Sequence, residues 1–248
     1  MQEGKRPDIS IIFPCLNEEQ SVVYCLEEML RVIKLHKLSA EVIVVDNAST
    51  DRSAELVIGF ARIFPELRLV REPRRGYGFA YQAGLRQAHG AAIIMADMDG
   101  TYSLQEIPAY LEKLAAGYDL VFGNRFAKTL PLGAMSGLRY VGNRFLSSVI
   151  RVLFGVRIDD TLCGMRALSS DALQKLSLTR GGMEFGWEMI VEATRNQLQI
   201  VNIPIPYASR LGVSKLKPFR DGFRYLLYIA TERLRQKSAL VLKIHDAR

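Results

Sequence analysis

Apolar residues in the first half of the chain form short continuous runs that alternate with segments of helical spacing. The runs have the length of buried strands and lie at residues 8–14, 41–46, 67–72, 91–97 and 119–125. The segments of helical spacing lie at residues 20–35, 49–64, 78–88 and 103–117. Strands that alternate with helices pair in parallel, so the pattern predicts an α/β fold with a mostly parallel central sheet flanked by helices. Ser103 and Glu106 match a capping box at the start of the last of these helices.

The second half continues with elements of less regular pattern. They are expected helices at residues 136–154 and 183–197, a loop and strand at 160–168, a strand at 198–208, a basic loop at 209–217 and an amphipathic helix within 218–244. No repeat or linker separates these elements. We therefore expect a catalytic domain over residues 1–217. The helical tail over residues 218–248 is either part of that domain or lies at a membrane interface.

Composition adds a preference for anionic partners. The chain has 248 residues, 49% of them apolar, and a formal net charge of +7. A positive balance suits phosphate, nucleic acid or an acidic membrane surface. The three cysteines show no close-pair spacing, which favours a reducing compartment. The N-terminus does not resemble a signal peptide, and no apolar run reaches the roughly 20 residues that cross a bilayer. We expect a protein that is soluble or attached to a membrane surface.

Polar residues stand at the carboxyl ends of several expected strands, which is the edge where parallel sheets bind ligands. These residues are Asn17, Glu18, Asp46, Asp97, Asp99 and Arg125. Asp97 and Asp99 are the most unusual, because they follow the apolar run AAIIMA directly. If the backbone stays extended, residues two apart face the same side, and two carboxylates in one space repel.

A divalent cation would relieve this repulsion. Mg²⁺ takes one or two protein carboxylates together with substrate phosphates, so Asp97 and Asp99 fit a metal–diphosphate site. The alternative is that one aspartate caps a turn while the other is solvated. The glycines of GYGFAY (76–81) do not form a dinucleotide fingerprint, because Tyr81 takes the third glycine position and the motif does not follow the first strand. They permit a tight turn before a helix, where the backbone could approach a nucleotide.

Motifs in a fixed order connect these observations. They are FPCLNEE (13–19), VIVVDNASTD (42–51), RRGYGFAYQAG (74–84), ADMDGTY (96–102), FGNRF (122–126), DTLCGMRA (160–167) and SRLGVSK (209–215). Together they resemble the inverting family 2 glycosyltransferases, and within them the dolichyl-phosphate mannose and glucose synthase group. The resemblance spans residues 8–222. It implies the GT-A fold, a Rossmann-like nucleotide-diphospho-sugar transferase architecture, and transfer of a hexosyl group from a nucleotide-diphosphate sugar to a polyprenyl phosphate.

The resemblance also implies roles for matching residues. The nucleotide would contact Pro14, Leu16, Asn17, Glu18, Asp46, Gly76 and Asp97. Mg²⁺ or Mn²⁺ would bind Asp97, Asp99 and Thr101, and Thr101 stands where the mannose synthases have a glutamine. The acceptor phosphate would contact Arg125, Arg139, Asn143, Arg210, Ser214 and Lys215. Asn143 stands where the family has a serine. The catalytic residues would be Asp97, Asp99, Asp160 and Arg125.

The residue types agree with this chemistry. A phosphate acceptor is already ionised near neutral pH and needs cations that align it rather than a base, and arginine can hold phosphate in a bidentate fork. No histidine falls in these motifs. We expect a single displacement with inversion at the anomeric carbon. Asp160 could orient the sugar or hold an arginine, and the sequence does not separate the two roles.

Alternatives remain open at this point. A glycosyltransferase acting on a sugar hydroxyl would need a base, which Asp160 or Glu184 could supply. A nucleic-acid binder would cluster its arginines with stacking aromatics, whereas here they are dispersed through loops, so we expect no nucleic-acid partner. A nucleotidyltransferase would need a glycine-rich, lysine-bearing loop near the N-terminus. GDP-mannose, UDP-glucose and UDP-N-acetylglucosamine all remain open as donors, although VDNASTD mildly favours uridine.

The expected lipid acceptor implies work at a membrane. The tail mixes aromatic and aliphatic residues with arginines and lysines, a composition that suits either an interfacial helix on anionic lipid or a helix packed on the domain. We expect a cytoplasmic protein, peripheral on the cytoplasmic face of a membrane, with or without a membrane-anchoring partner protein.

Overall fold

The computed structural model describes residues 6–215, 220 and 222–233. The chain falls into two compact units, residues 1–214 and 215–248. In the second unit, residues 222–233 are helical, in agreement with the tail expected there. Other parts of that expected tail, including SALVLKI at 238–244, lie outside the described residues. In the described part of the chain, every helix is too short or too polar to span a membrane.

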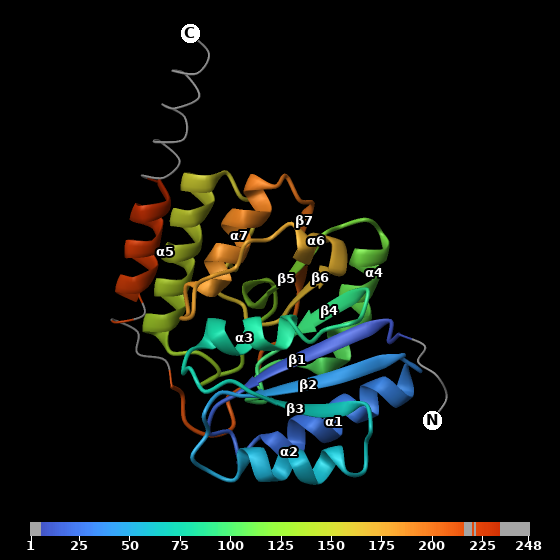
Figure 1. Cartoon of the computed structure of the whole chain (residues 1–248). Coiled ribbons are helices and arrows are strands. Elements are labelled where there is room, and N and C mark those ends of the chain that lie inside the picture. The colour runs from blue at the N-terminus through green and yellow to red at the C-terminus, as the bar shows by residue number, and fades with distance from the viewer. Residues whose placement is uncertain (1–5, 216–219, 221, 234–248) are drawn as a thin grey trace. The chain divides into compact units, whose positions relative to one another are not determined.

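A seven-stranded sheet forms the centre of the first unit (Figure 1). Its strands are β1 (Ile9–Cys15), β2 (Ala40–Asp46), β3 (Leu67–Arg71), β4 (Ala92–Met95), β5 (Leu120–Asn124), β6 (Arg166–Ser169) and β7 (Ile200–Pro204). The strand order is β3-β2-β1-β4-β6-β5-β7. Only β6 runs antiparallel to its neighbours among these strands. The mostly parallel sheet expected from the alternating pattern is therefore confirmed.

Helices connect the strands and cover both faces of the sheet. They are α1 (Val22–Leu35), α2 (Ser53–Ala61), α3 (Tyr77–Leu85), α4 (Ile107–Ala115), α5 (Gly137–Phe154), α6 (Ser170–Gln174) and α7 (Phe185–Arg195), with 3₁₀ turns η1 (Leu104–Glu106) and η2 (Arg125–Ala127). The capping box expected at Ser103 and Glu106 does not form. The chain enters through η1, and no side-chain cap is made there, because the Glu106 N–H bonds to the Ser103 carbonyl oxygen instead.

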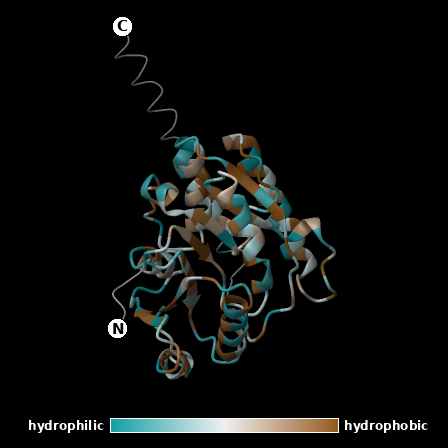
Figure 2. Ribbon diagram, turned by 90° about the vertical axis from the view of Figure 1, so that its right-hand side faces the viewer, coloured by the Kyte–Doolittle hydropathy of each residue, from teal (hydrophilic) through white to brown (hydrophobic). Residues whose placement is uncertain are grey.

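Alternate residues of each central strand serve different faces of the sheet. Ile11 and Val44 belong to a buried cluster that includes Leu26 of α1 and Val57 of α2. Ile12 lies on the opposite face, where α3 packs so closely that a Cβ on Gly84 would lie 2.5 Å from the Ile12 Cγ2 atom. Both faces are buried, so these strands are almost continuously apolar. Figure 2 shows that the helices carry both hydrophobic and hydrophilic residues.

Strand register aligns the loops that carry the polar residues. Cys15 at the end of β1 pairs with Asp46 at the end of β2, and Ile12 pairs with Met95 at the end of β4. The loops that follow these three strands consequently leave the sheet at the same edge. This places the polar strand ends on one side, as the sequence predicted.

Candidate active site

The acidic pair lies in the turn after β4. The strand ends at Met95, and residues 98 and 99 form a turn. Asp99 therefore lies in a turn rather than in a strand, so the extended backbone on which the alternation argument depended does not continue through Asp99. The charges of the two aspartates still interact, because the charge of Asp99 contributes to raising the pKa of Asp97.

The Asp99 carboxylate is buried and has an organised set of donors. Its Oδ1 atom accepts hydrogen bonds from the Thr101 backbone N–H at 3.0 Å and from the Thr101 hydroxyl at 2.6 Å. Its Oδ2 atom accepts a bond from Nη1 of Arg210 at 2.6 Å. Thr101, expected as a metal contact, thus orients the carboxylate in this structure.

Arg210 joins two acidic residues that are 81 positions apart in the chain. While its Nη1 atom binds Asp99, its Nη2 atom donates to Glu18 on the loop after β1. Backbone bonds hold the arginine's loop in place, since the Leu211 N–H donates to the Asp99 carbonyl oxygen at 2.9 Å. The loop expected to grip the acceptor phosphate is thereby attached to the acidic pair.

The carboxylate of Asp97 is stabilised by fewer hydrogen bonds than that of Asp99 in the described structure. Its Oδ1 atom lies 3.4 Å from the Tyr81 hydroxyl. Burial, followed by the charge of Asp99, raises the pKa of Asp97 to about 7. Arg210, Arg166 and Arg125 act in the opposite direction and lower it. A carboxylate in this position gains from a cation beside it.

These carboxylates suit a divalent cation that keeps positions for substrate oxygens. Within the described residues, no group of three or more histidine, cysteine, aspartate or glutamate side chains could form a closed metal cage. Asp97 and Asp99 offer hard oxygen ligands, and Mg²⁺ usually takes one or two carboxylates and completes its shell with phosphate and water. The donor set therefore fits the expected metal–diphosphate site.

The loops after β1 and β2 hold each other in position. Asn17, which has a left-handed φ of 54°, donates its backbone N–H to the Ser49 hydroxyl at 3.0 Å and accepts the Thr50 N–H at 2.7 Å. The Glu18 N–H donates to the Ser53 hydroxyl at 2.8 Å. This cross-linking places Glu18 near the acidic turn, where its carboxylate meets Arg210.

Other residues expected at the nucleotide lie along the same edge. Pro14 and Leu16 are half-buried at the end of β1. Asp46, at the end of β2, is buried and accepts the Ser49 N–H through Oδ1 at 3.0 Å. Gly76 donates its backbone N–H to Oδ1 of Asn47 at 2.7 Å.

Asn47 is a buried residue that the sequence reasoning missed. Its Nδ2 atom donates to the carbonyl oxygens of Glu72 and Arg74 at 3.1 and 2.8 Å, so with the Gly76 bond it fixes the whole loop after β3. Gly78 is required by packing, because a Cβ there would lie 2.0 Å from the Arg180 carbonyl oxygen. The only available signal for Asn47 was its place directly after Asp46 at a strand end.

The ionisation of Glu72 makes the contribution of this loop to folding stability depend on pH. Hydrogen bonds from Arg74, chiefly from its side chain, lower the pKa of Glu72 to about 2 from an ordinary value of 4.5. A lowered folded-state pKa contributes stability above pH 4.5, and this contribution disappears as the pH falls towards 2. We expect Glu72→Gln to lower the free energy of unfolding by about 1 kcal/mol at pH 7. The effect is this small because Arg74 is partly exposed and solvent screens its interaction with Glu72.

Urea denaturation of wild type and Glu72→Gln at pH 7, 5 and 3 measures this effect. The difference between the two proteins should shrink steadily below pH 4.5. A difference that stays constant down to pH 3 would show that the charge of Glu72 does not carry the effect.

Arg125 and Asp160 form a buried ion pair. Asp160 is completely buried and accepts bonds from Nε of Arg125 at 2.7 Å, from Nη2 at 2.8 Å and from the Arg125 backbone N–H at 3.1 Å. Asp160 therefore holds an arginine, which separates the two roles that the sequence left open. All three of these donors belong to Arg125, and the Asp160 side chain is shielded from solvent.

Glu184 differs from Asp160 in its surroundings. It precedes α7, and its carboxylate folds back over Gly182. Within the described part of the chain, its Oε2 atom is buried without a hydrogen-bond partner. The acid that could serve a hydroxyl acceptor is thus Glu184 rather than Asp160.

The remaining residues expected at the acceptor are less closely connected. Arg139, on the first turn of α5, donates from Nη2 to the Ser214 hydroxyl at 2.7 Å. Asn143, one turn further along, contacts the Met135 sulfur at 3.8 Å. Lys215 belongs to the second unit. Arg139 and Ser214 are therefore brought together, whereas no bond links Asn143 to the acidic pair in the described structure.

Arg166 is a second buried residue that sequence reasoning did not single out. Its guanidinium donates to the carbonyl oxygens of Cys163 and Gly186 at 2.8 and 3.1 Å, and it lowers the pKa of Asp97. The signal was an arginine inside an otherwise apolar strand motif, where an unpaired charge is too costly to bury without carbonyl partners.

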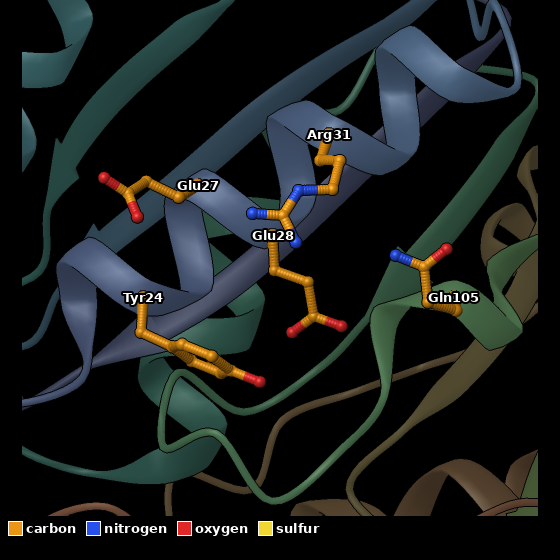
Figure 3. Close-up of a pocket in the computed structure, with 5 residues that line it drawn as sticks. All are labelled: Tyr24, Glu27, Glu28, Arg31 and Gln105. Atoms are coloured by element: carbon orange, nitrogen blue, oxygen red, sulfur yellow. The ribbon is translucent and has the colours of Figure 1, made fainter.

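A surface pocket of about 220 Å³ lies between α1 and η1 and contains none of these residues (Figure 3). Its lining is polar and consists of Tyr24, Glu27, Glu28, Arg31 and Gln105. Glu28 points into it, and its carboxylate accepts the Leu104 N–H at 3.1 Å. This hydrogen bond fixes the start of η1, so the position of Glu28 has a structural explanation.

Comparison with known proteins finds a match to the family described as "Glycosyl transferase family 2" over residues 10–176. The low-salt glycan biosynthesis hexosyltransferase Agl6 of Haloferax volcanii is 33% identical over 225 residues, covering 90% of this chain and 53% of that protein. The chain thus spans about half the length of this relative. A dolichyl-phosphate hexose transferase of the same organism is 29% identical over 222 residues, covering 90% of this chain and 92% of that protein.

A similar fold occurs in a solved structure. Glucosyl-3-phosphoglycerate synthase of Mycobacterium tuberculosis, crystallised with Mn²⁺, UDP and glucosyl-3-phosphoglycerate, superposes with a TM-score of 0.69. The alignment covers 92% of this chain and 80% of that chain at 20% identity. It confirms the α/β architecture expected for this sequence.

Proposed function

The chain belongs to glycosyl transferase family 2, and from this membership we propose that it transfers a hexosyl group from a nucleotide-diphosphate sugar to a polyprenyl phosphate. The product would be a polyprenyl-phosphate sugar, formed with inversion at the anomeric carbon. The similarity to a dolichyl-phosphate hexose transferase over nearly the full length of both proteins supports this acceptor class.

One observation carries the choice of a phosphate acceptor. The carboxylate of Asp160 is committed to Arg125, so this part of the site presents a guanidinium rather than a base. An ionised phosphate needs no base and is aligned by cations. Arg125 and Arg210 both lower the pKa of Asp97, which supports a role for their charges beside the acidic turn.

Mg²⁺ or Mn²⁺ is part of the proposal. Asp97 and Asp99 would hold it, and the ion would neutralise negative charge on the leaving diphosphate. Thr101 fixes the orientation of Asp99 through two hydrogen bonds. Glu18, Asp46 and Gly76 would line the nucleotide along the ends of β1 and β2 and the start of α3. The cross-linked loops after β1 and β2 hold this edge in place before substrate binds.

The acceptor phosphate would be held by Arg125, Arg139, Arg210, Ser214 and Lys215, with Asn143 at its edge. The contact between Arg139 and Ser214 supports this assignment, because it links α5 to the loop that carries Arg210. A polyprenyl phosphate resides in a membrane, so the protein would act at a membrane surface.

A hydroxyl acceptor is the second candidate function, and it is favoured by the Oε2 atom of Glu184, which is buried without a hydrogen-bond partner among the described residues. Incubation of membranes with a radiolabelled nucleotide sugar distinguishes the two. We expect label in a lipid that releases sugar in mild acid, together with a β-linked product from an α-linked donor. Label found only in a soluble glycan, or lost on Glu184→Gln with a flattened pH profile, would favour the hydroxyl acceptor.

A further inference from the structure

Helix α5 presents an apolar stripe on the side that faces away from the core. Ser147, Ile150 and Phe154 form its buried side. Exposed large apolar residues lie opposite, namely Leu138 at 64%, Val141 at 65%, Phe145 at 60% and Val152 at 78% exposure. At 100° per residue these four positions fall within an arc of about 60°. We call Leu138, Val141, Phe145 and Val152 the α5 stripe.

Exposed apolar residues elsewhere in the described first unit do not gather in this way. Single exposed side chains such as Leu35 on α1 and Ile63 after α2 are ordinary features of a soluble surface. A stripe that continues for four turns of one helix marks an interaction surface.

The residues around the α5 stripe are basic, and this charge indicates the kind of surface that the stripe contacts. Residues 125–158 contain six basic residues and no aspartate or glutamate. Lys128, Arg144, Arg151 and Arg157 are exposed within this segment. Arg144 extends over the rings of Phe126 and Tyr140, at 5.7 and 5.9 Å from their centroids. Apolar residues on one face of a helix with arginines beside them suit an anionic lipid interface.

We infer that α5 lies on an anionic lipid surface and inserts the α5 stripe into it. The orientation rests on the proposed function, because Arg139 and Asn143 occupy the other side of the same helix. A helix is about 10–12 Å wide with its side chains, and interfacial helices sink about 5–10 Å into the headgroup region. Arg139 and Asn143 then lie at the level of the lipid phosphates, where a polyprenyl phosphate presents its headgroup.

The test compares two variants of the full chain. Val141→Asp/Phe145→Asp places charges in the stripe, and Ile63→Asp changes a residue of similar exposure, 72%, in the turn after α2. We expect the double variant to partition at least about tenfold less onto vesicles of phosphatidylglycerol and phosphatidylcholine, because two apolar side chains no longer enter the lipid. Ile63→Asp should bind like wild type, and all three proteins should bind less at high salt.

Other outcomes overturn the inference. Wild-type binding that the double variant retains would place the membrane contact elsewhere, for example in residues 215–248. A wild-type dimer that becomes monomeric in the double variant, with vesicle binding unchanged, would make the stripe an interface between two copies. An activity assay with a short-chain polyprenyl phosphate in detergent separates this test from the proposed function, because the acceptor is then not in a membrane.

The double variant should have the wild-type kcat in this assay. If the wild-type protein binds vesicles but does not transfer sugar to this acceptor, the proposed function is wrong and the inference about α5 still holds.

Discussion

Asp99→Asn should abolish metal-dependent binding of the nucleotide diphosphate and lower sugar transfer by about a hundredfold or more. A bound metal supplies several kcal/mol of charge stabilisation at a leaving diphosphate, and each 1.36 kcal/mol is a factor of ten in rate. The amide keeps the shape of the side chain and its oxygen can still accept from Thr101, but its NH₂ group takes the place of Oδ2 and cannot accept from Arg210, so the variant loses the negative charge together with the Arg210 bond. Calorimetry with UDP or GDP, each titrated with and without Mn²⁺, measures the binding directly.

A matched control separates this effect from a general loss of negative charge. Asp159→Asn also removes one carboxylate, but Asp159 is exposed and pairs with Arg151 at 3.1 Å. It should bind Mn²⁺ and nucleotide like wild type. Thermal unfolding of both variants establishes that they are folded. Unchanged Mn²⁺-dependent nucleotide binding by folded Asp99→Asn would remove the metal site from the proposal.

The sheet was predictable because each strand shows its own pattern of apolar residues in the sequence. Strands such as β1 and β2 are buried on both faces, so they appear as continuous apolar runs between helices with one apolar face. The antiparallel course of β6 was not predictable in the same way. It depends on how residues 125–165 return to the sheet, and its four residues carry no signal for direction.

The sequence predicted which residues belong to the candidate site better than it predicted which of their side chains bond to each other. Motifs gave Asp99, Asp160 and Arg210 as residues of one site, because each lies at a strand end or in a loop of a recurring pattern. Which arginine meets which carboxylate depends on side-chain geometry across 35 and 111 positions of chain. The burial of Asp160, which decides its role, could not be inferred from a motif.

The Arg125–Asp160 pair gives the second large effect. Asp160→Asn should lower the free energy of unfolding by about 3 kcal/mol, because it leaves the Arg125 guanidinium buried without its counter-charge. Adding Arg125→Met removes that charge and should restore at least half of the loss, since a buried pair replaced as a unit is often nearly neutral. The asparagine oxygen can still accept the backbone N–H of residue 125.

Activity should not follow stability in this series. Arg125→Met/Asp160→Asn should fold well and still transfer sugar poorly, because the cation that aligns the acceptor phosphate is gone. The pH dependence of kcat/KM in Asp160→Asn should keep the wild-type shape, since a carboxylate enclosed by Arg125 takes no proton from an acceptor. Chemical denaturation and a pH–rate profile measure the two properties separately. If Asp160→Asn were as stable as wild type but lost the acidic limb of that profile, Asp160 would be a base, and a hydroxyl would replace phosphate as the acceptor.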